Sequence, residues 1–291
     1  MKILSDFDGV LTDPSPEAAR VKEVFYNHFI TLPGTSQPQM SELWEQAQNQ
    51  LIHSPHQHGW KSGEKITAYA NEDGFIECNG LAACLDDMVS KAEKRSLNVQ
   101  NSLKQKEFSN FCEMSQFAFN EVVKETSAGR HHPLDPSAAI VFQTLLSRGI
   151  EIVIVSNSGT ERITNLFLQR CPGLLQSSEN RLRIRGGAQK FVLGENSDSF
   201  EVGPYVVHTD RPKYQTILVE EKPDIILGDV FSLDLALPLQ LARRKLHGFE
   251  KVRLLMRKRN YSPQWSTAYF SHTKGVSCGL FESLDDLLAL I

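Results

Sequence analysis

A short apolar run near the start of the chain is followed at once by two carboxylates. The run begins at Ile3 and leads into Asp6 and Asp8, and Gly9 comes next. Side chains alternate faces along a strand, but a chain that bends at Gly9 can bring both carboxylates together. Converging carboxylates repel each other unless a hard cation or a shared proton lies between them. The segment therefore predicts a strand that ends in a cation site, with Mg²⁺ as the expected ion and an anion as the expected substrate.

Two later apolar runs also end in polar side chains. They span residues 150–155 and 224–228. The polar residues that follow them are Ser156, Asn157, Asp229 and Asp234. An Asp-Gly pair after a strand is also an ordinary turn, but turn chemistry alone does not explain three such ends in one chain. Because ligands of open α/β sheets bind beyond the carboxyl ends of the strands, we expect these side chains to share one site.

The three segments resemble the motifs of the haloacid dehalogenase-like hydrolase superfamily, whose members are mostly magnesium-dependent phosphatases. The first motif matches residues 6–13, the second matches Ser156, and the fourth matches Gly228 with Asp229 and Asp234. The third motif of the family is a lone Lys or Arg. We assign it to Lys213, which precedes the strand that leads to Asp229, and Lys190 and Arg211 are the rival candidates.

The resemblance implies a role for each residue. Asp6 would be the nucleophile that forms an aspartyl phosphate, and Asp8 would be the general acid and then the general base. Ser156, Asn157 and Lys213 would bind the phosphoryl group. The implied ligands of Mg²⁺ are Asp6, Asp8, Asp229 and Asp234. Structural alternatives stay open: Ser156 as a helix cap, Asp234 as the N-cap of the helix that follows, and Lys213 as a solvated surface lysine.

Helical spacing dominates the segment between the first and second motifs. Apolar residues recur at this spacing in most of residues 14–133,, and one of the expected helices spans 64–70. We therefore predict an all-helical cap domain at 14–133, inserted into an α/β core formed by residues 1–13 and 134–291. Strands alternate with helices in the core, which predicts a doubly wound, Rossmann-like parallel sheet, with a hairpin at 181–193. In the family, such an insertion is a mobile cap over the catalytic cleft.

The histidines give weaker signals than the carboxylates. His53, His56 and His58 lack the spacing of a preformed zinc site,, so we expect an exposed loop there. His131 and His132 stand at the predicted exit from the insertion, where we interpret them as linker residues.

Charge and hydropathy along the chain argue against two classes of partner, nucleic acids and membranes. The formal net charge is -4, and acids and bases are mixed along the chain, so we expect no nucleic-acid partner. No apolar run reaches the roughly 18 residues of a membrane span, and the N-terminus lacks a signal region. We therefore expect no membrane association and a cytoplasmic location. The five scattered cysteines suit reduced thiols. The oligomeric state stays unknown.

The leading functional hypothesis is a Mg²⁺-dependent phosphatase that acts on a small phosphorylated metabolite. A phosphomutase or another phosphoryl-transfer enzyme would keep Asp6 and Asp8 but protect the intermediate from water. A non-catalytic binding protein is the third alternative, and it has no need of both a nucleophile and a metal. The physiological substrate cannot be read from the sequence, because in this fold the cap selects it.

Overall fold

The computed structural model describes residues 1–91, 93–127, 134–177, 181–196 and 198–291. The chain divides into two compact units. The first unit comprises residues 1–13, 62–67 and 132–291, and the second comprises residues 14–61 and 68–131. His131 and His132, interpreted above as linker residues, lie outside the described residues.

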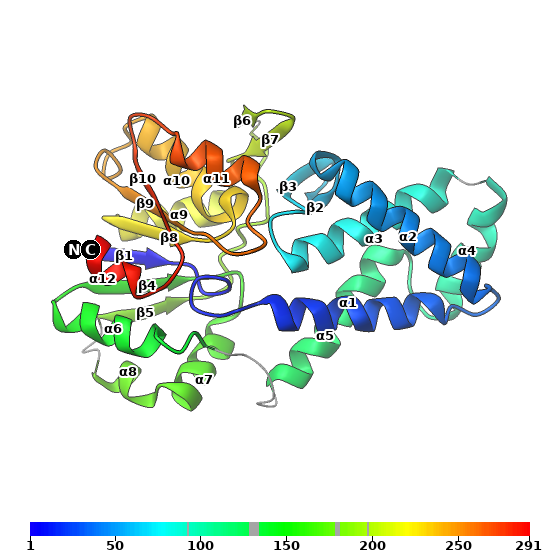
Figure 1. Cartoon of the computed structure of the whole chain (residues 1–291), viewed down its shortest axis with the longest axis horizontal. Helices are drawn as coiled ribbons and strands as arrows, with labels where there is room; N and C mark the ends of the chain where they lie inside the picture. The colour runs from blue at the N-terminus through cyan, green and yellow to red at the C-terminus, as the bar shows by residue number, and fades with distance from the viewer. Residues whose placement is uncertain (92, 128–133, 178–180, 197) are drawn as a thin grey trace. The chain divides into compact units, whose positions relative to one another are not determined.

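The first unit is built on a six-stranded parallel sheet with the strand order β10-β9-β8-β1-β4-β5 (Figure 1). Its strands are β1 (Lys2–Ser5), β4 (Glu151–Val155), β5 (Leu182–Arg185), β8 (Ile225–Gly228), β9 (Arg253–Arg257) and β10 (Ser277–Phe281). From β1 the chain moves outward through β4 to β5, and it then returns to β8 on the other side of β1. The strand order therefore reverses between β1 and β8, the place where open α/β sheets bind their ligands.

Helices cover both faces of this sheet (Figure 1). Apolar side chains of β1 alternate between the two layers, with Ile3 in one core cluster and Leu4 in the other,. The first cluster includes side chains from α6 (Ala138–Ser147), α7 (Thr160–Arg170), α8 (Pro172–Ser177) and α12 (Asp286–Leu290). The second cluster includes side chains from α9 (Pro212–Glu221), α10 (Ala236–Arg243) and α11 (Gln264–Ser271). The predicted α/β, doubly wound fold class is confirmed.

The second unit has a helical core of its own. Its helices are α1 (Ser15–Ile30), α2 (Gln37–His53), α3 (Gly74–Lys91), α4 (Glu93–Gln105) and α5 (Phe111–Ser127). Phe25 and Phe29 lie on one face of α1 at i, i+4 spacing. The ring of Phe29 packs on Trp44 and on Phe111, with centroids 5.3 and 5.2 Å apart. These large buried rings give the unit an apolar centre independent of the sheet.

The insertion is not wholly helical, which corrects the sequence-based prediction. A short 3₁₀ turn (Pro55–Gln57) is followed by the two-stranded sheet of β2 (Gly59–Ser62) and β3 (Lys65–Tyr69). The expected helix at 64–70 is therefore a strand, as its β-branched and aromatic residues permit. His58 precedes β2 with only 5% of its surface exposed, so the expectation of an exposed loop was wrong for this residue.

The predicted hairpin at 181–193 is also wrong. Residues 182–185 form β5, which pairs in parallel with β4 at one edge of the sheet. The polar residues of its alternating pattern, Arg183 and Arg185, bind Glu221 of α9 at 2.6 and 3.1 Å. The pattern thus marks an edge strand with one charged face. The antiparallel hairpin lies farther along the chain and consists of β6 (Ser199–Val202) and β7 (Tyr205–His208).

The cysteines and the apolar character of the helices can be compared with the predictions from composition. The five cysteines are free thiols, and burial raises the pKa of Cys78 to about 11. Within the described residues, no helix combines the length and apolar character needed to cross a bilayer.

Candidate active site

The first predicted motif begins where β1 ends. Asp6 follows Ser5 directly, and its backbone N–H donates to the carbonyl oxygen of Leu227 in β8 at 2.9 Å. The chain then turns away from the sheet, and Gly9 adopts a φ of +79°. A Cβ at this position would lie 1.9 Å from Oδ2 of Asp229. Glycine is therefore required here both by the left-handed backbone and by the close approach of a carboxylate from β8.

A lysine from the loop after β5 lies against two carboxylates. Lys190 Nζ donates to Asp6 Oδ1 at 2.6 Å and to Asp234 Oδ1 at 2.8 Å. The Lys190 side chain is 1% exposed. Burial alone would lower the pKa of this ammonium, but the carboxylates of Asp234 and Asp6 raise it well above its ordinary value,. Lys190 is therefore a fixed positive charge beside Asp6.

The two carboxylates of the first motif have different surroundings. Burial raises the pKa of Asp6 well above its ordinary value, and the Lys190 ammonium opposes that rise. Asp8 is less buried, and its Oδ2 accepts hydrogen bonds from Ser156 Oγ at 3.3 Å and from Ser158 Oγ at 3.0 Å. Asp6 thus faces a cation, whereas Asp8 faces two hydroxyl groups. Different environments of this kind suit two carboxylates to different chemical roles.

The second motif stands at the end of β4, as predicted. Besides donating to Asp8, Ser156 Oγ accepts a hydrogen bond from the N–H of Ser158 at 2.9 Å. The side-chain oxygen of Asn157 accepts from the backbone N–H of Lys190 at 2.7 Å. Helix α7 begins only at Thr160 and has no side-chain cap. Ser156 is therefore bonded within the site and does not cap that helix.

Two loops lie against each other beside this motif. The N–H groups of Gly187 and Ala188 donate to the carbonyl oxygens of Ser158 and Ser156, each at 2.9 Å. A Cβ on Gly186 would lie 2.2 Å from the backbone nitrogen of Thr160. Only glycine allows this approach, and the approach carries the next residues, including Lys190, to the carboxylates.

The structure places Lys190 against Asp6, and the assignment of the third motif to Lys213 stays a prediction. Lys213 is an exposed residue in the first turn of α9. Arg211, the other rival, is fully buried. Its guanidinium donates to the backbone carbonyl oxygens of Lys190 and, at 2.9 Å, of Ser232. Arg211 thus holds the backbone of the two segments that carry Lys190 and Asp234, and it does so through hydrogen bonds to their carbonyl oxygens.

The carboxylates that follow β8 are both buried, with Asp229 2% exposed and Asp234 3% exposed. Asp234 lies in the π-helical turn Phe231–Leu235. Its Oδ2 accepts from the N–H groups of Asp229 and Val230 at 3.2 and 3.0 Å, while Oδ1 accepts from Lys190. Asp234 therefore does not cap the helix that follows, because its side chain accepts from residues that precede it and α10 (Ala236–Arg243) has no side-chain cap.

Three carboxylates form a potential cation site. Asp6, Asp229 and Asp234 each offer one oxygen, and these atoms all lie within 4.8 Å of one another. Carboxylate oxygens are the hard ligands that Mg²⁺ and Ca²⁺ prefer. The donor chemistry of the site therefore fits a magnesium ion.

Two residues that contact the carboxylates of the site were not among those predicted from the sequence. They are Ser158, which binds Asp8, and Tyr261, whose hydroxyl donates to Asp229 Oδ2 at 2.8 Å. Ser158 had a detectable signal, since it stands two residues after Ser156 in the same strand end. Tyr261 had none, because it is far from every motif in the sequence.

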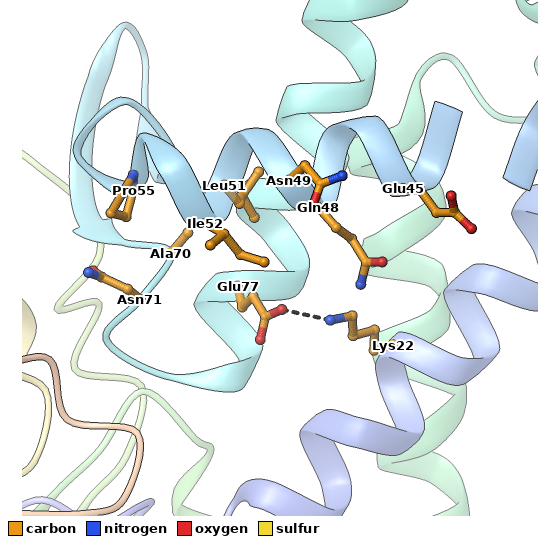
Figure 2. Close-up of a pocket in the computed structure, with 10 residues that line it drawn as sticks. All are labelled: Lys22, Glu45, Gln48, Asn49, Leu51, Ile52, Pro55, Ala70, Asn71 and Glu77. Carbon is orange, nitrogen blue, oxygen red and sulfur yellow. Dashed lines mark hydrogen bonds and ion pairs between the residues drawn. The ribbon is translucent and has the colours of Figure 1, made fainter. Parts of the chain in front are cut away.

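A separate cavity of about 760 Å³ lies within the second unit. Its walls come from α1, α2 and α3, and Figure 2 shows Glu45, Gln48 and Asn49 along one side. Lys22 forms an ion pair with Glu77 at 2.6 Å (Figure 2). None of the predicted site residues lines this cavity. The candidate catalytic groups are therefore the carboxylates of the first unit.

No protein-family model and no curated protein sequence matches this chain. The solved structures that are similar to it include the following three. YfnB from Bacillus subtilis, described as a HAD-hydrolase bound to magnesium, shares 12% identity, with 99% of this chain and 97% of that chain covered, at a TM-score of 0.46. A predicted phosphoglycolate phosphatase from Haemophilus somnus shares 13% identity, with 99% and 96% covered, at a TM-score of 0.47. A Thermotoga maritima protein described as a β-phosphoglucomutase shares 14% identity, with 100% and 99% covered, at a TM-score of 0.48.

The chain resembles the haloacid dehalogenase-like hydrolases. At the identities found, similarity to solved structures concerns the fold. The contacts of the site residues are therefore what can support a particular chemistry.

Proposed function

We propose that the protein is a Mg²⁺-dependent phosphatase that hydrolyses a small phosphorylated metabolite through an aspartyl-phosphate intermediate. The observation that carries this proposal is the position of Lys190, whose ammonium lies 2.6 Å from Asp6 and 2.8 Å from Asp234. A carboxylate that attacks a dianionic phosphate must overcome charge repulsion. A fixed cation beside that carboxylate, together with a site for a divalent ion, provides the compensation.

Asp6 is the proposed nucleophile. A carboxylate oxygen of Asp6 attacks phosphorus, the phosphorus–oxygen bond to the leaving group breaks, and the phosphoryl group is transferred to Asp6. An ionised carboxylate needs no base for this step. Lys190 favours the ionised form of Asp6 through its charge, and it would also bind an oxygen of the transferring group. We therefore propose Lys190, in place of Lys213, as the cation of the third motif.

Asp8 is the proposed general acid and base. It would protonate the leaving alkoxide in the first step and then take a proton from the water that attacks the acyl phosphate. The hydroxyl groups of Ser156 and Ser158 fix one oxygen of this carboxylate by hydrogen bonds of 3.3 and 3.0 Å. Restricting the carboxylate in this way would hold its proton near the leaving group. Ser156 would also contact a phosphoryl oxygen.

The residues that would hold Mg²⁺ are Asp6, Asp229 and Asp234, with the backbone carbonyl of Asp8. When bound, the ion would neutralise charge on the substrate and on the carboxylates. Asp234 already receives hydrogen bonds from two backbone N–H groups and from Lys190. We therefore expect Asp234 to contribute negative charge to the ion site and to orient Lys190 directly.

Substitution of Asp6 tests this mechanism. Asp6→Asn should lower hydrolysis of an aryl phosphate in the presence of Mg²⁺ by more than about a thousandfold, because an amide cannot form the phosphoenzyme. Unfolding in urea should show no loss of stability, since the substitution removes a buried charge. Asp13→Asn, at an exposed position in the same segment, is the matched control and should keep full activity. Activity that survives in Asp6→Asn would remove the proposed mechanism.

The same assay separates the phosphatase from a phosphomutase. A phosphatase releases inorganic phosphate continuously, and chelation with EDTA stops the release until Mg²⁺ is returned. A phosphomutase would accumulate the aspartyl phosphate and release phosphate slowly. A screen of phosphorylated metabolites would then identify the substrate, which we expect the second, mostly helical unit to select as a cap.

A further inference from the structure

The segment at the end of β9 contacts two parts of the proposed site, the loop that follows Asp8 and the carboxylate of Asp229. It spans residues 257–261, starting at the last residue of β9, and carries Arg257, Arg259 and Tyr261. β9 pairs with β8 in parallel, so the carboxyl ends of the two strands lie at the same edge of the sheet. The segment therefore begins beside the strand end that carries Asp229.

The two arginines bind the loop that follows Asp8. The Arg259 guanidinium donates to the carbonyl oxygens of Gly9 at 2.7 Å and of Thr12 at 2.6 Å. The Arg257 guanidinium donates to the carbonyl oxygen of Val10. Charged donors form stronger hydrogen bonds with carbonyl oxygens than neutral donors do. These contacts fix the path of the loop, which includes the glycine that lies against Asp229.

Tyr261, from the same segment, contacts the carboxylate of Asp229. Its hydroxyl donates to Asp229 Oδ2 at 2.8 Å. The same oxygen faces Gly9, where a Cβ would lie 1.9 Å away. Oδ2 of Asp229 is thus restrained by a hydrogen bond on one side and by close backbone on the other.

We propose that Tyr261 is a positioning residue for the divalent cation. Its hydroxyl fixes the rotation of the Asp229 carboxylate about its last bond, so that a bound cation is contacted through the other oxygen. This inference rests on the proposed metal site. Groups that hydrogen-bond a ligating carboxylate typically change metal affinity by about 10–100-fold when they are removed.

A phenol suits this position better than a charged donor does. Lys190 already places one positive charge beside the proposed cation site, and an arginine or lysine at the same oxygen of Asp229 would add a second and weaken cation binding by repulsion. The two arginines of the segment direct their guanidinium groups to backbone carbonyls and to Asp135, which Arg257 binds at 2.6 Å. The donor that contacts Asp229 from this segment is the neutral one.

The test is the affinity for Mg²⁺, measured on the 291-residue chain by calorimetry without substrate. Tyr261→Phe removes one oxygen and keeps the ring, and it should weaken Mg²⁺ binding by about tenfold. The kcat at saturating Mg²⁺ should stay close to that of the unsubstituted protein, because the chemistry is carried by other groups. The Mg²⁺ concentration that gives half-maximal activity should rise in proportion.

Tyr269→Phe is the matched control. The hydroxyl of Tyr269 accepts a hydrogen bond from Arg243 at 2.7 Å, so the same atom is removed from a bond of similar length in α11. This variant should bind Mg²⁺ with unchanged affinity.

Three results would overturn the inference. Equal Mg²⁺ affinity in Tyr261→Phe and the unsubstituted protein would show that Tyr261 does not position the ligand. An equal loss of melting temperature with and without Mg²⁺, and with no change of affinity, would assign Tyr261 a structural role only. Absence of Mg²⁺ binding by the unsubstituted protein would overturn the metal site itself and the proposed function with it, so the two failures are distinguishable.

Discussion

Each of the two units contains a lysine that pairs with a carboxylate at the same distance. Lys190 lies 2.6 Å from Asp6 in the first unit, and Lys22 lies 2.6 Å from Glu77 in the second. Their surroundings differ. The first pair is 1% and 10% exposed, whereas the second is 29% and 44% exposed.

The difference shows that distance alone does not decide the role of an ion pair. Water screens the exposed pair, which is worth about 0–1 kcal/mol. Removing two charges from water is unfavourable, and a buried pair persists only when its remaining groups are also bonded. Lys190 meets this condition with a second carboxylate from Asp234. Burying Lys190 with two carboxylates costs desolvation free energy, and buried charged groups of this kind, with shifted pKa values, are typical of functional sites.

The strongest test of this comparison is Lys190→Met. We expect phosphatase activity to fall by about a hundredfold to a thousandfold, because the charge beside the nucleophile is lost. Stability without Mg²⁺ should fall by about 3–5 kcal/mol, since two buried carboxylates lose their cation. Enzyme assays and urea unfolding measure the two effects.

Lys213→Met is the control for that variant, since Lys213 is exposed. It should keep its activity, and its stability should stay within about 0.5 kcal/mol. The opposite pattern, with activity lost in Lys213→Met and kept in Lys190→Met, would return the third motif to Lys213.

A smaller effect on stability is expected from substitution of Glu221, a buried carboxylate away from the site. Burial would raise the pKa of Glu221, but hydrogen bonds from Arg183 and Arg185 hold it below its ordinary value. Its stabilisation is therefore present above the unfolded-state pKa near 4.5 and is lost as the pH falls through the lower folded-state pKa,. Glu221→Gln should lower the free energy of unfolding by about 1 kcal/mol at neutral pH.

Urea unfolding at a series of pH values checks this prediction. The difference between Glu221→Gln and the unsubstituted protein should shrink as the pH falls below about 4.5. Glu151→Gln, at a half-exposed carboxylate 3.8 Å from Lys2, should show little difference at any pH. A gap that stays constant with pH would mean that the charge of Glu221 does not stabilise the fold.

The smallest effect on stability and activity is expected for Lys22→Met in the second unit. Loss of an exposed ion pair should change the free energy of unfolding by no more than about 1 kcal/mol. Phosphatase activity on an aryl phosphate should be unchanged, as measured by phosphate release. A tenfold fall in activity would contradict the division of roles and would give the cavity beside Lys22 a part in the reaction.

Local patterns predicted the parts of the molecule that depend on nearest neighbours in sequence. Apolar runs predicted β1, β4 and β8, because a buried parallel strand must be apolar on both faces. The polar residues that follow these strands, including Asp6 and Asp229, were predicted to meet, and three of the carboxylates do lie within 4.8 Å of one another. The rule that parallel strands end at one edge was sufficient for this.

Errors arose where a pattern had two physical causes. The alternating residues 181–185 were interpreted as part of a hairpin, although an edge strand with a charged face alternates in the same way. That error placed Lys190 within a strand, and Lys190 stayed only a rival candidate for the cation behind Lys213. The segment 64–70 was interpreted as a helix, and strand pairing overrode that preference because β-structure depends on partners distant in sequence.

The sequence by itself determined which strand ends carry carboxylates, because each motif is a short run that folds with its own strand. Only the tertiary structure decided which cation reaches Asp6 and which residues hold the site together. Lys190, Arg211 and Tyr261 come from loops whose paths are set by long-range contacts, such as the approach of Gly186 to Thr160. The side chain of a lysine is the same at every position, and only its surroundings decide what it binds.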